Sequence, residues 1–176
     1  NKLGYKNLLK ISSNLSTNSN FDKFVAHENL FRYCDGLIIL TGGVEKGFIG
    51  KPASFGNEEL VDDRLNLLTN YFQDNLYIEL QRHGIDSEEI AEPILLKAAT
   101  DLNLPIVATN DCYFISPDKF ESHQILSCID RGHTLSSLNR RVLTKEHFLK
   151  DTQMMINLFR DIPEAIENTI IIAQRC

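Results

Sequence analysis

Two carboxylates stand where an α/β protein could use them for chemistry. Asp111 directly follows an apolar segment and a Thr-Asn turn, and Glu79 lies inside the apolar segment 76–80. A carboxylate at the end of a buried strand can bind a metal ion or act as a general base. Asp111 could equally bond its own backbone in a turn. For Glu79 the residues favour an ion pair with a nearby Lys or Arg, because an unpaired buried carboxylate is costly.

The histidines do not form a local metal site. They are His27, His83, His123, His133 and His147. No two of them are separated by two residues, as on a strand, or by four, as on a helix. Hydrolysis by a metal cluster needs several His, Asp or Glu side chains that converge on one pocket. The spacing therefore argues weakly against a metal enzyme within this segment, and each His alone is more typical of a polar surface or core position.

Glycine-rich and nucleophile motifs are missing from the chain. Gly42 and Gly43 do not belong to a phosphate-binding loop, since neither the G-x-x-x-x-G-K-[ST] nor the G-x-G-x-x-G pattern occurs. No G-x-S-x-G elbow supports acyl transfer. The two glycines more simply allow the chain to turn sharply after an apolar run.

Composition describes an ordinary globular domain. The chain has 176 residues, of which 43% are apolar and 24% charged, enough for one domain with its own core. The net charge of −6 leaves room only for a local basic patch, with Arg131, Arg140 and Arg141 as candidates, and a solvated polar loop is the favoured interpretation of that patch. The four scattered Cys residues favour a reducing cytoplasm. No apolar run approaches the roughly 20 residues of a membrane span.

The chain alternates segments typical of strands and helices. Strands are expected at 36–40, 76–80 and 104–108. Helices are expected after a cap at Asn57, after a cap at Asp86 or Ser87, from Ser116, and through the remainder from about Thr144. The first should pack through Leu60, Leu65, Leu68 and Phe72, and the second through Ile90, Ile94, Leu95, Ala98 and Leu102. Ser12–Asn20 is expected to be a polar loop. Within the remainder, Asp151 is expected to cap residues 152–159. The last helix should pack through Ala165, Ile166, Thr169, Ile170 and Ala173.

Such alternation is typical of parallel β-α units, whose working residues follow the carboxyl ends of the strands. The segments 41–43 and 110–113 are therefore the main candidates for a site.

Five stretches in order resemble one family. They are G-Y-K-N-L at 4–8, D-G-L-I-I-L-T-G-G at 35–43, Y-I-E-L-Q-R-H-G at 77–84, L-P-I-V-A-T-N-D at 104–111, and L-F-R-D-I-P-E-A-I-E-N-T at 158–169. Together they are similar to the polymerase-and-histidinol-phosphatase (PHP) domain of bacterial DNA polymerase III alpha subunits. Each stretch alone is weak, but five in the right order cover nearly the whole chain.

The resemblance implies an α/β fold, an incomplete distorted β/α barrel of the PHP type with a helical C-terminal part. Residues 1–176 would be the C-terminal portion of one PHP domain. The family's first strands, with their H-x-H motif, would then precede Asn1, and the polymerase core would follow Cys176. The parent would be a DNA-directed DNA polymerase, a nucleotidyltransferase whose core uses Mg²⁺.

The resemblance also implies a degenerate metal site. Family members with an active cluster carry N-D-x-H and a Cys after the strand-end turn, whereas this chain has Asn110-Asp111-Cys112-Tyr113 and Gly43. Asp111 would be a vestigial ligand, and Gly43 and Tyr113 would occupy former ligand positions. A phenol is a poor ligand and glycine has no side chain. Cys112 would point to the opposite face. Glu79 and Asn110 would line the pocket, and the segment would hold no cofactor and no catalytic residue.

The resemblance to family members with such a degenerate metal site also implies a docking role for this segment. The expected partners are a proofreading exonuclease subunit and the rest of the polymerase III holoenzyme, with DNA bound mainly by other domains and no membrane. An isolated fragment would dimerise or rearrange through unpaired sheet edges. One alternative is an active metal-dependent phosphoesterase or 3'-5' exonuclease that uses Asp111 as a ligand. Another is a binding module unrelated to replication, which would make the five matches coincidental.

Overall fold

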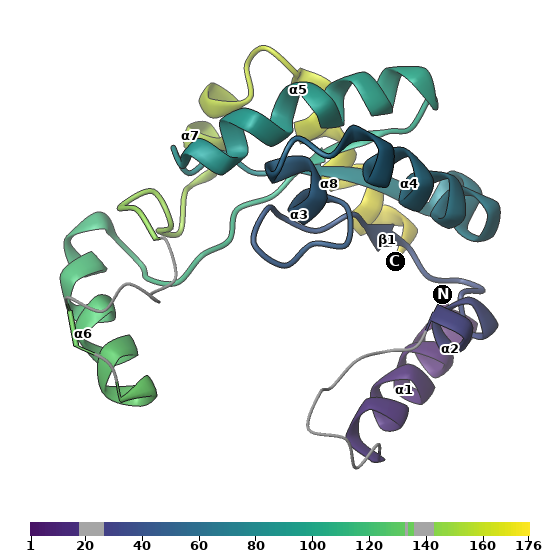
Figure 1. Ribbon diagram of the computed structural model, residues 1–176, viewed down its shortest axis with the longest axis horizontal. Coiled ribbons are helices and arrows are strands. Elements are labelled where there is room, and N and C mark those ends of the chain that lie inside the picture. The colour runs from purple at the N-terminus through teal and green to yellow at the C-terminus, as the bar shows by residue number, and fades with distance from the viewer. Residues whose placement is uncertain (18–26, 133, 136–142) are drawn as a thin grey trace.

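The structure is a computed structural model of residues 1–176, and it describes residues 1–17, 27–132, 134–135 and 143–176 (Figure 1). The strands are β1 (Ile39–Leu40), β2 (Leu76–Leu80) and β3 (Ile106–Ala108). The helices are α1 (Lys2–Thr17), α2 (His27–Arg32), α3 (Gly50–Ser54), α4 (Glu58–Phe72), α5 (Asp86–Asp101), α6 (Phe120–Arg131), α7 (Thr152–Leu158) and α8 (Pro163–Arg175). Short 3-10 turns cover Gln73–Asn75 and Pro117–Lys119.

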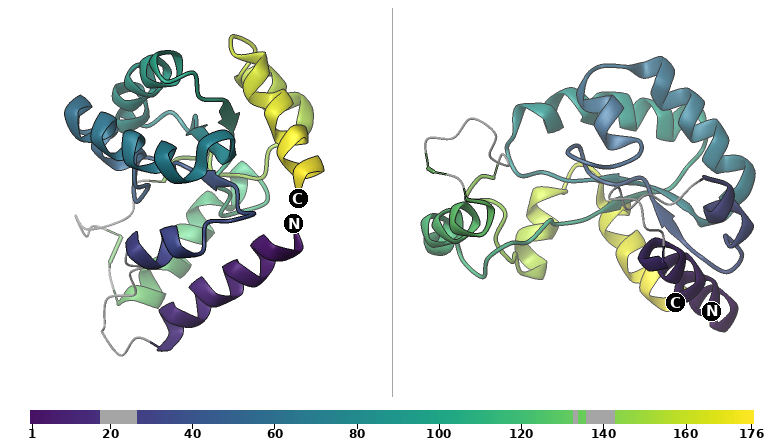
Figure 2. Two further views of the ribbon diagram at one scale, coloured as in Figure 1. Left: turned by 90° about the vertical axis from the view of Figure 1, so that its right-hand side faces the viewer. Right: turned by 60° about the horizontal axis from the view of Figure 1, so that its bottom comes forward.

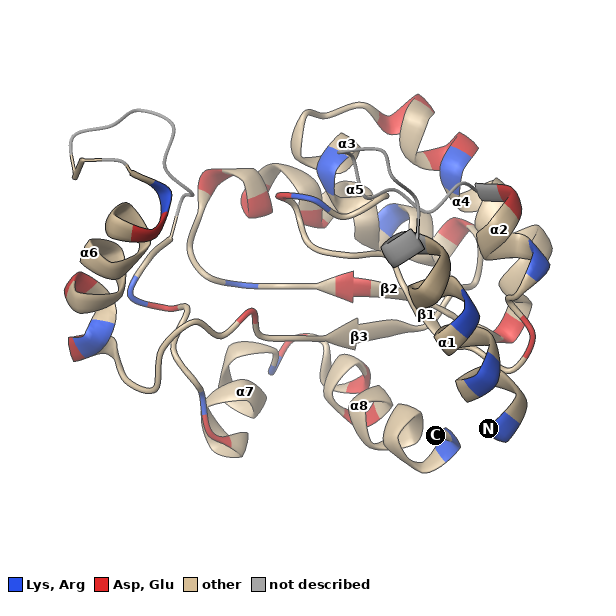
Figure 3. Cartoon of the chain, turned by 90° about the horizontal axis from the view of Figure 1, so that it is seen from below, with Lys and Arg blue, Asp and Glu red and all other residues tan. Residues whose placement is uncertain are grey.

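The sheet is parallel, as the alternation of elements predicts, and its strand order is β1-β2-β3. Leu40 pairs with Tyr77, and Glu79 pairs with Val107. Helices α4 and α5 lie on one side of β2 and β3, and α7 and α8 lie on the other (Figure 3). All three strands run in one direction, so their carboxyl ends meet at one edge of the sheet. The described residues form this three-stranded sheet and not a closed barrel.

The core lies between the sheet and helices α4 and α5. Leu65, Leu68 and Phe72 of α4 and Leu95 of α5 are buried against the central strand, as their helical spacing predicts. The expected cap of α4 is confirmed, because Asn57 accepts a hydrogen bond from the Leu60 amide at 3.1 Å.

The expected start of α5 is wrong in two respects. Ile85 occupies the N-cap position and no side chain caps the helix, so neither Asp86 nor Ser87 is the cap. The acidic first turn favours the helix through its dipole instead. Ile90, expected on the packing face, is exposed.

The C-terminal helices close the other side of the sheet. Asp151 caps α7 as predicted, accepting from the Met154 amide at 2.8 Å. Helix formation begins at Thr152 and not near Thr144, because Phe148 bridges to Phe114 in extended backbone. The packing face expected for α8 holds only in part. Ala165 is buried and Ile166 half-buried, whereas Thr169, Ile170 and Ala173 are exposed since β3 has only three residues for the helix to cover.

The N-terminal helix continues through part of the segment expected to be a loop. Residues 12–17 belong to α1, and 18–20 lie outside the described residues. Asn7 donates to the Asp35 carbonyl at 3.0 Å, and a Cβ at Gly4 would lie 1.9 Å from the Gly36 carbonyl oxygen. This close approach fixes α1 against the segment that leads to β1. The two chain ends lie near each other in both views of Figure 2.

Helix α6 stands apart from the sheet (Figure 1). Pro117 opens the 3-10 turn before it, in agreement with the predicted start at Ser116. Of the basic patch, Arg131 is exposed, whereas Arg140, Arg141 and His133 lie outside the described residues. Within the described ranges, no helix combines the length and apolar character needed to cross a membrane.

Candidate functional site

The predicted site segments do converge on one pocket of about 360 Å³ at the carboxyl ends of the strands. The loop after β1, the end of β2, the first turn of α5 and the segment around residue 147 all contribute to it. Its lining residues are Gly42, Gly43, Val44, Glu45, Lys46, Gly47, Glu79, Gln81, His83, Ile85, Glu88, Asp111 and His147.

Glu79 is held by neutral donors from all three strand ends. Its Oε2 accepts from the Gly42 amide at 3.0 Å, and its Oε1 accepts from Gln81 Nε2 at 3.0 Å and from the Thr109 hydroxyl at 2.5 Å. Its own amide donates to the Thr41 hydroxyl at 2.8 Å. Among the residues that the structure describes, Glu79 forms no ion pair with Lys or Arg, so the expected pair is not found there. Neutral hydrogen bonds satisfy the carboxylate because the parallel register brings these donors to it.

Two positions in the loop after β1, Gly42 and Gly43, have no room for a side chain. Gly42 has a φ of +80°, and a Cβ there would lie 2.6 Å from the Gly47 Cα. At Gly43 a Cβ would lie 2.1 Å from Gln81 Oε1. The side-chain amide of Gln81 therefore fills the space beside Gly43.

His83 and Glu88 form a buried pair in the wall of the pocket. Their side chains are 1% and 6% exposed, and His83 Nδ1 lies 2.7 Å from Glu88 Oε1. The His83 amide donates to Glu88 Oε2 at 2.5 Å. On the other side of the ring, Nε2 lies 3.0 Å from Asn110 Oδ1 and 3.2 Å from the Asp111 amide. The imidazole thus links the first turn of α5 to the strand end after β3.

A second imidazole lies on the first. His147 stacks on His83 with ring centroids 4.0 Å apart, and its Nδ1 accepts from the Thr144 amide at 3.1 Å. Burial, followed by the charge of His83, lowers the pKa of His147 to about 4. At neutral pH this imidazole is therefore an uncharged hydrogen-bond acceptor.

Asp111 and Tyr113 face each other at the edge of the pocket. The Tyr113 hydroxyl donates to Asp111 Oδ2 at 3.1 Å. Asp111 lines the pocket, whereas Asn110 lies behind His83 and donates to the Phe148 carbonyl at 2.8 Å. Cys112 is exposed and does not line the pocket.

These residues do not fit the metal cluster of active family members. Glu79 accepts three internal hydrogen bonds, Asp111 accepts one from the Tyr113 hydroxyl, and Gly43 has no side-chain ligand atom. Among the residues that the structure describes, no group of three or more His, Cys, Asp or Glu is arranged to hold a metal ion. The chemistry of this donor set is that of a hydrogen-bonded network.

Sequence reasoning identified the two carboxylates but missed four of their neighbours. Gln81 and His83 follow β2 in the same way that Asp111 follows β3, so their position after a strand was an available signal. Glu88 and His147 carried no such signal. His147 is 64 residues from the ring on which it stacks, a separation that no local pattern reveals.

The fold and the strand-end pocket define an α/β domain whose pocket is lined by hydrogen-bonded carboxylates and histidines. Residues 1–83 match the family model of the PHP domain.

Three curated relatives are similar to this chain over nearly its whole length. The chain is 37% identical over 178 residues to DNA polymerase III subunit alpha of Caulobacter vibrioides, which covers 100% of this chain and 16% of that protein. The subunit alpha of Rickettsia bellii is 38% identical over 176 residues, covering 98% and 15%. That of Haemophilus influenzae is 35% identical over 178 residues, covering 100% and 15%. The chain thus spans about a sixth of the length of these relatives.

Proposed function

We propose that this chain is the PHP segment of the alpha subunit of a replicative DNA polymerase III. The parent enzyme would be a cytoplasmic DNA-directed DNA polymerase whose core, with Mg²⁺, extends a primer during chromosome replication. Residues 1–176 would be the C-terminal portion of its PHP domain. The similarity to three alpha subunits across 98 to 100% of the chain supports this assignment.

Within that enzyme, the segment is structural and carries no hydrolytic activity. One observation supports this role above the others: the carboxylates of Glu79 and Asp111, which line the pocket, accept hydrogen bonds from the chain itself. A carboxylate that accepts internal hydrogen bonds is a poorer metal ligand, since the bonds at the coordinating oxygen would have to be broken first.

Metal content of the intact protein tests the structural role. After incubation with Zn²⁺ and Mn²⁺ and then dialysis, elemental mass spectrometry should find far less than one ion per chain in the PHP domain. Ions retained in at least equimolar amount would contradict the proposal. They would favour instead a metal-dependent phosphoesterase or 3'-5' exonuclease that uses Asp111 as a ligand.

The segment also docks a proofreading exonuclease subunit and contributes to the polymerase III holoenzyme, while other domains bind DNA. The degenerate pattern at Gly43 and Tyr113 supports this part of the proposal, because family members with that pattern use a separate exonuclease. A pull-down of the intact protein with the purified exonuclease subunit should recover a complex. A result no stronger than that of an unrelated acidic protein would contradict docking.

An isolated fragment of these residues dimerises through its sheet edges. Within the described ranges, β1 and β3 each pair with β2 alone, so each presents one edge without a strand neighbour. Multi-angle light scattering should give twice the mass of the 20.1 kDa chain. A monodisperse monomer would contradict this expectation.

A further inference from the structure

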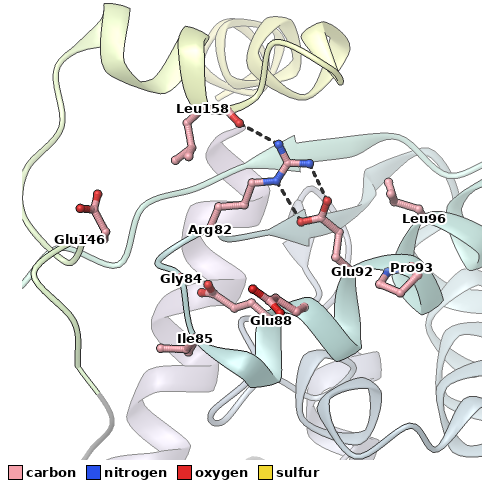
Figure 4. A pocket seen from close by; sticks show the side chains of 10 residues that line it. Arg82, Gly84, Ile85, Glu88, Glu92, Pro93, Leu96, Glu146 and Leu158 are labelled. Atoms are coloured by element: carbon pink, nitrogen blue, oxygen red, sulfur yellow. Dashed lines mark hydrogen bonds and ion pairs between the residues drawn. The ribbon is translucent and has the colours of Figure 1, made fainter.

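A second and larger cavity lies beside the strand-end pocket. This groove has a volume of about 550 Å³ and shares the wall of Ile85 and Glu88 with the pocket. The turn between β2 and α5 and the first half of α5 form one side of it, and Glu146 and Leu158 reach it from the C-terminal part of the chain (Figure 4).

Apolar side chains form one part of the groove wall. They are Ile85, Pro93, Leu96 and Leu158. Pro93 lies inside α5, where its ring replaces an amide N–H. This wall gives an apolar side chain or an aliphatic stem a surface on which to pack.

Among the described residues that line the groove, Arg82 is the single cation, and its N–H groups are all used within the chain. Arg82 makes five hydrogen bonds: two to Glu92, two to Asp161, and one to the Leu158 carbonyl at 2.7 Å. A guanidinium has five N–H donors, so all of them are used. The Arg82 charge is also offset by two carboxylates, which makes the groove a poor site for an anion.

The polar groups that remain in the groove are acceptors. Glu89 is exposed and, among the described residues, has no ion-pair partner. Its backbone carbonyl receives no helical hydrogen bond, because the residue four positions later is Pro93. Glu146 is half exposed and lies across the groove from α5 in Figure 4, although it also pairs with Lys150.

We propose that this groove docks a segment of a partner protein that presents a Lys or Arg next to an apolar side chain. The cationic head lies between Glu89 and Glu146, and the apolar neighbour packs on Leu96 and Leu158. Charge complementarity selects the basic residue, and the apolar wall selects a polypeptide over a free inorganic cation. The acidic rim excludes nucleic acid, whose phosphates it would repel.

The groove does not require the proposed function to be correct, because its argument uses none of the pocket carboxylates Glu79 and Asp111. Its occupant would nonetheless lie against the wall of Ile85 and Glu88 that the two cavities share.

Photo-crosslinking to the intact protein tests the proposal. The probe is a short peptide with Arg–photoleucine–Leu at its centre, and the matched probe has Glu in place of Arg. Mass spectrometry should place the adducts of the Arg peptide on segments that contain Ile85, Leu96 or Leu158. Their yield should be at least about fivefold above that of the Glu peptide, and it should fall as salt is added.

Charge reversal at the groove supplies the decisive comparison. The double variant Glu89→Lys and Glu146→Lys should abolish or invert the preference for the Arg peptide. The control Glu59→Lys and Asp63→Lys changes the net charge equally on the exposed face of α4 and should retain it. Equal yields for the two peptides, adducts outside the groove, or a preference that survives reversal at the groove would each overturn the proposal.

Discussion

Glu79 and Arg82 stand three residues apart at the end of the central strand and use opposite kinds of partner. Within the described part of the chain, the carboxylate of Glu79 accepts hydrogen bonds from neutral groups alone, and it lines the pocket. The guanidinium of Arg82 is surrounded by carboxylates and ties β2 to α5 and to the connection between α7 and α8. Arg82 also lies over the Phe159 ring, 4.7 Å from its centroid.

The difference separates two roles at one strand end. The Arg82 cluster holds two layers of helices to the sheet through charge-assisted bonds, which are about twice as strong as neutral ones. The Glu79 cluster joins loops that surround a pocket. Substitutions at the Arg82 cluster should therefore affect stability more than those at the Glu79 cluster.

The largest effect is expected for Arg82→Ala. It leaves Glu92 and Asp161 without their partner and removes the contact with Phe159. We expect α7 and α8 to lose about 3 kcal/mol of protection against opening, measured by hydrogen exchange with mass spectrometry. Lys97→Ala, which breaks the exposed pair with Glu58, is the control and should change protection little. Equal effects of Arg82→Ala and Lys97→Ala would show that the Arg82 cluster stabilises the fold no more than an exposed ion pair does, and its distinction from the Glu79 cluster would then be lost.

A smaller loss is expected for Glu79→Gln. The side-chain NH₂ group of the new Gln must face either the Gly42 amide or the donors at Gln81 and Thr109. Donor then faces donor, so at least one hydrogen bond is lost. Protection of the loop 41–47 should fall by about 1–2 kcal/mol, while that of α7 and α8 should stay unchanged. If α8 loosened as much as the loop, the two clusters would act as one unit.

The pH dependence of stability should report on His147. The folded state lowers the pKa of His147 to about 4 from 6.5, so between these values the unfolded chain binds more protons. The contribution of the neutral His147 to the free energy of unfolding is therefore complete above about pH 6.5. It is lost as the pH falls toward 4, with a total on the order of 1–2 kcal/mol. His83, Asp111 and Glu88 are the charged or titratable groups that influence it. Urea unfolding across this range should show a flatter profile for His147→Gln than for the native chain.

The smallest effect is expected for Tyr113→Phe. Loss of one neutral hydroxyl donor to Asp111 should cost about 0.5–1 kcal/mol of protection in the segment 109–114, with no change at Arg82. Hydrogen exchange compared with the Glu79→Gln variant gives the measurement. A loss larger than that of Glu79→Gln would show that Asp111, and not Glu79, dominates the pocket.

The sequence predicted the parts of the molecule that depend on local pattern. Strand-helix alternation predicted the parallel sheet, and Asn57 and Asp151 cap helices where their positions indicated. The placement of Asp111 at a strand end was also available from the pattern. Each of these follows from residues within a few positions of one another.

Contacts between distant segments were not predictable in the same way. Glu79 gains its partners from Gly42 and Thr109, which reach it only through the parallel register. The exposure of Ile170 depends on the short length of β3, which the apolar run 104–108 did not reveal. Hydrophobic periodicity indicates a face that can be buried but not how far the neighbouring strand extends.

The contact between Gly43 and Gln81 also limits the paths by which this domain could change over evolutionary time. Any side chain at position 43 requires the Gln81 side chain to move, because its Cβ would lie 2.1 Å from Gln81 Oε1. Displacing that amide would free two acceptors, Glu79 Oε1 and the Thr109 hydroxyl, from their donor. A substitution at Gly43 alone would therefore weaken this hydrogen-bonded network. A joint change at Gln81 would relieve the contact, so the two positions are expected to change together.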